Sequence, residues 1–99
     1  MTQELQPIGS EVLFEDEEVR VWKLDLPAGE ATPIHEHHHD YVFVVVAGGA
    51  TESVNSDGTT ERSSDQRGDA VHHQAPLVHH LRNVGDSRYV NVIVEFLQT

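Results

Sequence analysis

The chain has 99 residues, of which 37% are hydrophobic, so it has enough apolar side chains for one core and no room for a second domain. Its formal net charge of -11 predicts that it repels nucleic acid and anionic membranes, and we expect neither as a partner. Cysteine is absent, which excludes disulfides, thiolate metal ligands and a cysteine nucleophile.

The apolar pattern predicts a cytoplasmic, soluble protein. The first residues, MTQELQPIGS, have neither the basic start nor the apolar stretch of a signal peptide. The longest apolar run, from Tyr41 to Ala47, is far shorter than the roughly 20 residues that a membrane-spanning helix needs.

Apolar and polar residues alternate with a period of two along most of the chain, which predicts an all-β protein. Residues 1–10 are expected to form an N-terminal arm that a dimer partner orders. Strands are then expected, in chain order, at residues 12–14 and 19–26, at the histidines that begin at position 35, at 41–46, in a hairpin between 50 and 68, and at 70–73, 79–83 and 89–96. So many short strands separated by turn residues favour a closed barrel or a jelly roll, because closure removes exposed strand edges.

Two of these strands carry long apolar alternations. In the last strand, the set expected to face the core is Val90, Val92, Val94 and Phe96. The strand at 41–46 is apolar on both faces, so it is expected to lie between the core and a second layer. Its outer stripe, formed by Val42, Val44 and Val46, predicts a homodimer, because a monomer would leave these valines exposed.

The eight histidines all lie between positions 35 and 80, and four of them fall within the five residues 35–39. Residues two apart on a strand face the same side, so His35 and His37 can point at one place inside a barrel. His38 is assigned to a turn, and His39 is a further candidate ligand if the strand runs straight through it. A pair of histidines is half of a metal site, and the other half must come from elsewhere in the fold.

The segment HHLRN, at positions 79–83, offers a further histidine. His79 shares a face with the apolar Leu81, whereas His80 shares the opposite face with Arg82 and is expected to face solvent. Asn83 is expected to form structural hydrogen bonds at the end of this strand.

The spacing around the first histidine pair resembles the first motif of the cupins, which is a Gly, five residues, His-x-His, three or four residues, a Glu, six residues and a Gly. Gly29, His35, His37 and Gly48 stand at these positions, with Tyr41 in the place of the Glu. The second motif ends in a His and an Asn separated by three residues.

Positions 79 and 83 match the end of the second motif, and Gly68 and Asp69 stand where it opens. Gln74 and Pro76 replace its usual Pro and Gly. The resemblance covers most of the chain and is closest to small cupins of catabolic clusters, such as those for β-alanine degradation. It implies a single cupin domain over residues 1–99 that folds as a jelly-roll β-barrel.

The resemblance further implies that His35, His37 and His79 bind one divalent transition metal ion, with positions left open for water or substrate. Iron, nickel, manganese, copper and zinc all suit imidazole ligands. Three neutral imidazoles leave the charge of the ion uncompensated, which favours an anionic small-molecule ligand.

Two residues are candidates for a catalytic role. Tyr41 either places its phenol near the metal, as a distal ligand or a proton donor, or is an ordinary aromatic residue of the barrel lining. One of His72 and His73 must face the interior, and His73 is the candidate general acid or base, with a buried structural histidine as the alternative.

The family resemblance therefore predicts an enzyme of dioxygenase or isomerase type that acts on a small organic acid or an amino-acid-like molecule. The alternative is a non-catalytic cupin that binds a small ligand, with or without metal, as a sensor or accessory subunit. Because cupins host many functions on one barrel, the resemblance indicates the fold more directly than the reaction.

Overall fold

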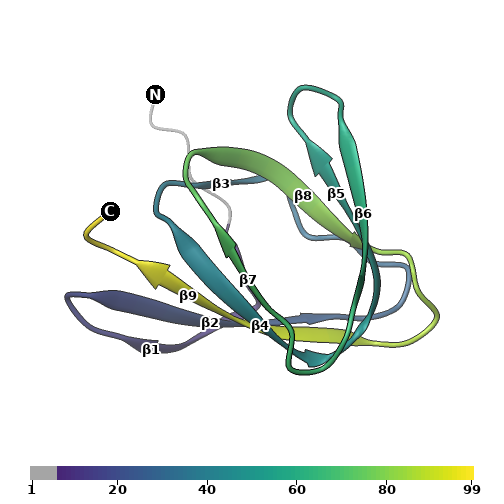
Figure 1. Ribbon diagram of the computed structural model, residues 1–99, viewed down its shortest axis with the longest axis horizontal. Helices are drawn as coiled ribbons and strands as arrows, with labels where there is room; N and C mark the ends of the chain where they lie inside the picture. Colours follow the sequence, from purple (N-terminus) through teal and green to yellow (C-terminus); the bar gives the residue numbers. More distant parts are fainter. Residues whose placement is uncertain (1–6) are drawn as a thin grey trace.

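The computed structural model describes residues 7–99, and these residues form nine strands and no helix long and apolar enough to cross a membrane (Figure 1). The strands are β1 (Glu11–Glu15), β2 (Val19–Leu26), β3 (His35–His37), β4 (Tyr41–Ala47), β5 (Gly49–Asn55), β6 (Thr60–Asp65), β7 (Ala70–His73), β8 (Leu77–Asn83) and β9 (Tyr89–Phe96). The prediction of an all-β protein is confirmed. Residues 1–6, the first part of the expected N-terminal arm, lie outside the described residues.

The strands form two antiparallel sheets that face one another across the interior (Figure 1). One sheet has five strands in the order β1-β2-β9-β4-β7, and the other has four strands in the order β3-β8-β5-β6. Strands that neighbour one another in space are mostly distant in sequence, as β2 and β9 are. Strand β2, near the start of the chain, therefore pairs with β9, near its end, in the middle of the five-stranded sheet.

The core lies between the sheets and is small. Its buried apolar residues are Ile8, Leu24, Tyr41, Val45, Tyr89 and Ile93. Ile8 belongs to the expected N-terminal arm, and the backbone of Ser10 bonds to that of Lys23 at 2.7 Å. The described end of the arm is thus packed on its own chain.

The inner face of β9 differs from the prediction. The residues that point into the interior are Tyr89, Asn91, Ile93 and Glu95, and the expected core set of Val90, Val92, Val94 and Phe96 is half-buried on the outer face. That expectation is wrong, because the interior of this barrel lines a cavity and carries polar side chains. The apolar set covers the outside of the sheet instead.

The outer face of the five-stranded sheet is correspondingly apolar. On β4, Val44 and Val46 are 38% and 48% exposed, as expected for an outer stripe. The register places Val42 opposite Val94, and Val44 opposite Val92. The valines of two adjacent strands therefore form one continuous apolar surface on this face.

The structure explains why two positions of the motif must be glycine. Gly29 has a φ of 81°, a conformation that a residue with a side chain rarely adopts, in the turn after β2. Gly48 lies between β4 and β5, where a Cβ would stand 2.2 Å from the carbonyl oxygen of Asp65. Only glycine allows this close approach.

Asn83 forms the structural hydrogen bonds that the sequence predicts. Its amide nitrogen donates to the carbonyls of Leu26 and Ser87 at 2.9 and 2.8 Å, and its Oδ1 accepts from the backbone of Gly85 at 2.9 Å. The buried side chain thus joins the end of β8 to the turn before β9.

Candidate metal centre

Three buried histidines meet inside the barrel on strands β3 and β8. His35 and His37 point inward from β3, and the register places His79 of β8 directly opposite His35. The Nε2 atom of His37 lies 3.1 Å from the Nε2 of His35 and 3.1 Å from the Nε2 of His79. The possible ligand atoms of all three lie within 4.8 Å of one another, so the structure brings together the three residues that the sequence analysis singled out.

Backbone and side-chain groups orient two of the three rings. The Nδ1 of His35 lies 2.9 Å from the carbonyl oxygen of Pro33, which can only accept, so Nδ1 carries the hydrogen and Nε2 has a free lone pair. The Nδ1 of His79 lies 2.7 Å from the hydroxyl of Ser53. Such outer hydrogen bonds are typical of metal-binding histidines, where they direct the other ring nitrogen at the ion.

The ring of His37 is held differently. Its Nδ1 is buried and has no hydrogen-bond partner within residues 7–99. The ring instead stacks on that of Tyr41, with centroids 4.1 Å apart and an angle of 17° between the planes. Tyr41 therefore positions His37 by packing.

The three Nε2 atoms fit a bound cation better than they fit one another. A neutral His37 has at most one hydrogen on Nε2, which cannot satisfy both of its 3.1 Å contacts, since His35 already offers a lone pair. Three nitrogens about 2.1 Å from one ion and at right angles to each other lie about 3.0 Å apart. The two separations measured from His37 match this arrangement.

Burial keeps these imidazoles neutral. It lowers the pKa of His37 to about 2 and that of His79 to about 4, with further lowering from the neighbouring histidines. Burial also lowers the pKa of His35, against the hydrogen bond to Pro33, which raises it. The neutral form is the one that binds metals, and it is the form that burial favours here.

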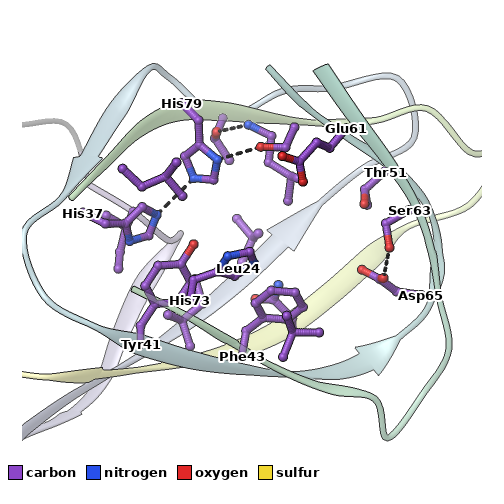
Figure 2. Close-up of a pocket in the computed structure, with 18 of the residues that line it drawn as sticks. Leu24, His37, Tyr41, Phe43, Thr51, Glu61, Ser63, Asp65, His73 and His79 are labelled. Atoms are coloured by element: carbon purple, nitrogen blue, oxygen red, sulfur yellow. Dashed lines mark hydrogen bonds between the residues drawn. The ribbon is translucent and has the colours of Figure 1, made fainter. Parts of the chain in front are cut away.

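The histidines open into a cavity of about 370 Å³ between the sheets (Figure 2). Tyr41, Phe43 and His73 form one wall, and the rings of Tyr41 and His73 stack with centroids 5.3 Å apart. Tyr41 is 3% exposed, and its hydroxyl points into the cavity without a partner among the described residues (Figure 2). Burial raises the pKa of this phenol well above its usual range, so it keeps its proton.

The remaining histidines are separated from this cluster. His73 faces the cavity beside Tyr41, whereas His72 lies opposite Val42 on the outer face and is exposed. Strand β3 ends at His37, so the chain turns at His38, which is exposed as expected. The candidate ligand His39 lies beyond that turn, outside the three-histidine cluster, in a second hollow beside Glu36.

The sequence analysis did not find the groups that surround the cluster. Pro33 and Ser53 orient the rings of His35 and His79, and Glu61 of β6 lines the cavity opposite Ser53. Parity within a strand shows which residues share a face, but only the pairing of β5 with β8 brings Ser53 to His79. A serine in a polar hairpin carries no such signal by itself.

Solved structures share this fold. A cupin domain from Bordetella pertussis Tohama I is 26% identical, with a TM-score of 0.81, and the match covers 97% of this chain and 98% of that chain. A protein with a double-stranded β-helix domain from Klebsiella pneumoniae subsp. pneumoniae MGH 78578 is 23% identical, with a TM-score of 0.73, over 97% and 81% of the two chains. An RmlC-like cupin from Methanocaldococcus jannaschii is 16% identical, with a TM-score of 0.73, over 97% and 92%.

The two facing sheets and these likenesses define the protein as a small single-domain cupin, which confirms the predicted jelly-roll barrel. A comparison with curated proteins finds no match. The model of the cupin family described as "Auxin binding protein" matches residues 5–94. The chain belongs to that family.

The neutral, buried histidines predict a loss of stability in acid. The unfolded chain binds protons at histidine near pH 6.5, whereas His37 and His79 stay neutral in the folded protein down to lower pH. Stability is therefore complete above about pH 6.5 and falls below it, by up to about 1.4 kcal/mol per pH unit for each histidine. Urea unfolding of metal-free protein at pH 7.5, 6.5 and 5.5 measures this slope.

The control is the exposed His38. We expect His79→Asn to reduce the pH dependence of the free energy of unfolding by the contribution of one histidine. The variant His38→Asn should leave this pH dependence unchanged. A free energy of unfolding that stays constant between pH 7.5 and 5.5 contradicts the prediction.

Proposed function

We propose that this cupin binds one divalent transition metal ion through His35, His37 and His79 and acts on a small organic acid or an amino-acid-like molecule. The observation that carries the proposal is the convergence of three buried histidines, in which the Nε2 of His37 lies 3.1 Å from the Nε2 atoms of both His35 and His79. A bound ion of this kind supplies positive charge that polarises an oxygen of the substrate, or it activates dioxygen. Iron, nickel, manganese, copper and zinc all suit the three ligands.

We infer an enzymatic role from the groups beside the histidines. Tyr41 has a protonated hydroxyl that is directed into the cavity, where it can donate to a substrate oxygen. His73 stacks on Tyr41 and lines the same cavity, where it can take up or release a proton. Proton transfer beside a metal-bound carbonyl is what an isomerase needs, so these groups support an isomerase better than a dioxygenase.

A non-catalytic ligand-binding or sensor role is the second candidate. The cavity is open at the β5–β6 hairpin, where Glu61 and Ser63 are exposed, and the loops between strands are short. An enzyme that must exclude water uses a lid, whereas a sensor does not need one. The description of the family names auxin as a bound molecule, which agrees with ligand binding in the barrel.

The outer face of the five-stranded sheet supports a homodimer. Val44 and Val46 are large exposed apolar residues, and they continue the surface formed by Val92 and Val94 of β9. A two-fold axis through this face would bury the same stripe of both copies. The cytoplasmic location and the kinship with β-alanine clusters stay predictions of the sequence.

Metal analysis tests the first step. The purified wild-type protein should retain about one divalent ion per chain, and His35→Ala or His79→Ala should lose it. Ser53→Ala should weaken metal binding by about ten-fold, because the hydroxyl orients His79. His38→Ala is the matched control and should bind like wild type. Stoichiometric metal in both alanine variants of the cluster rules out the assignment.

The variant Tyr41→Phe separates enzyme from sensor. Phenylalanine keeps the stacking on His37, so metal affinity should stay within about two-fold of wild type, whereas the loss of the proton donor should lower turnover by at least about 100-fold. A screen of small acids by thermal shift first supplies stabilising ligands, and each is then tested for conversion. If ligands stabilise the protein and none is converted, the sensor role holds.

Light scattering tests the dimer. Wild-type protein at micromolar concentration should have twice the mass of the chain, and Val44→Glu should give a monomer, because a charge on the outer stripe opposes burial of that face. Ser64→Glu, on the exposed surface of β6, is the control and should remain dimeric. A wild-type monomer contradicts the proposal.

A further inference from the structure

The inner face of β6 lines the cavity at the edge of the sheet whose strands β3 and β8 carry the three histidines. The register pairs Glu61 with Ser53 and Ser63 with Thr51, both of which line the cavity on β5. Because side chains alternate along a strand, Glu61, Ser63 and Asp65 share one face of β6, and all three line the cavity. Arg62 also borders the cavity, but its guanidinium forms an ion pair of 3.0 Å with Glu52.

Two acceptor side chains lie at this end of the cavity, Asp65 on β6 and Asn91 on β9 of the facing sheet. The carboxylate of Asp65 accepts from the hydroxyls of Tyr89 at 2.9 Å and Ser63 at 2.5 Å, so it is already satisfied. Asn91 donates to Tyr89 at 3.2 Å, and its Oδ1 is buried without a partner within residues 7–99, although Asn91 is only 3% exposed.

The carboxylate of Glu61 adds an unpaired negative charge beside these acceptors. Its carboxylate has no hydrogen bond or ion pair to any residue in the described part of the chain. This end of the cavity therefore holds a free negative charge and an unpaired acceptor, and Arg62, the charged donor among its lining residues, is already paired with Glu52.

Glu61 also lies close to the histidine cluster. Ser53, its partner across the β5–β6 ladder, reaches the Nδ1 of His79 with its hydroxyl at 2.7 Å. Side chains directly opposite one another on neighbouring strands start about 5 Å apart. Figure 2 shows the Glu61 carboxylate directed into the cavity on the side of His79. One small molecule can thus touch both the cluster and Glu61.

We propose that Glu61 is a specificity-determining residue that binds the ammonium group of a zwitterionic ligand, whose carboxylate lies at the histidine cluster. The inference rests on the proposed function, because the carboxylate needs the metal-bearing end of the cavity. An ammonium group supplies the donors and the positive charge that the unpaired carboxylate of Glu61 can accept. A dicarboxylate would instead bring a second negative charge against Glu61 and Asp65.

Calorimetric titration of metal-loaded protein with matched pairs of probes tests this assignment. The pairs are 3-aminopropanoate with propanoate and 4-aminobutanoate with butanoate, which differ only in the ammonium group and place it at two distances. For at least one pair, the amino acid should bind about five-fold more tightly, as expected for a partly exposed ion pair.

Variants test whether the preference for the amino acid depends on the carboxylate of Glu61. Glu61→Gln should bring the ratio of affinities to about one, and Glu61→Lys should reverse it. Glu52→Gln removes the same charge from the outer face of the neighbouring strand and should keep the wild-type ratio.

The outcomes separate the two proposals. A protein that binds no divalent ion overturns the proposed function and this inference together. Metal-loaded protein that binds both members of each pair equally, or a preference that persists in Glu61→Gln, overturns the inference alone.

Discussion

The candidate site depends on the antiparallel pairing of β3 with β8. The paired stretch is only three residues long, and it places His35 opposite His79. A slip of one residue would turn the side chains of β3 to the other face and separate the cluster. Thr32 holds the register beyond the strand, because its backbone donates to Leu81 at 2.9 Å and its hydroxyl accepts from Leu81 at 2.9 Å. A threonine before the histidines thus secures the geometry at His79.

The cavity that this pairing requires changes which face of each strand is apolar. An interior that holds three histidines and a cavity cannot be filled by valines, and β9 points Asn91 and Glu95 inward. Glu95 is buried, and it accepts a hydrogen bond from the indole of Trp22 at 2.5 Å. Much of the apolar surface then lies outside the five-stranded sheet. A polar interior with a cavity and an apolar exterior are two consequences of one arrangement.

The sequence predicted the strands well because period-two alternation is a local property of the chain, and it paired His35 with His37 for the same reason. It failed at β9, where both alternating sets contain large residues and parity cannot say which set faces inward. Ser53 and Glu61 were missed because their place depends on the register of β5 with β8 and β6. His79 was identified from the spacing of the cupin motif. That spacing reflects a contact between distant strands, which no local pattern of residues contains.

Tyr41 stands where the cupin motif has a Glu, so the carboxylates of this cavity lie on other strands. A carboxylate at this position would neutralise part of the charge of a bound ion, whereas a buried phenol that keeps its proton leaves that charge intact. The carboxylates nearest the cavity are instead on β6, at Glu61 and Asp65. With an ion bound, the cavity would be positive at the histidines and negative along β6. Such a field would orient a dipolar ligand and disfavour the same ligand turned end for end, so a tyrosine in place of the carboxylate would give the proposed site a basis for selectivity.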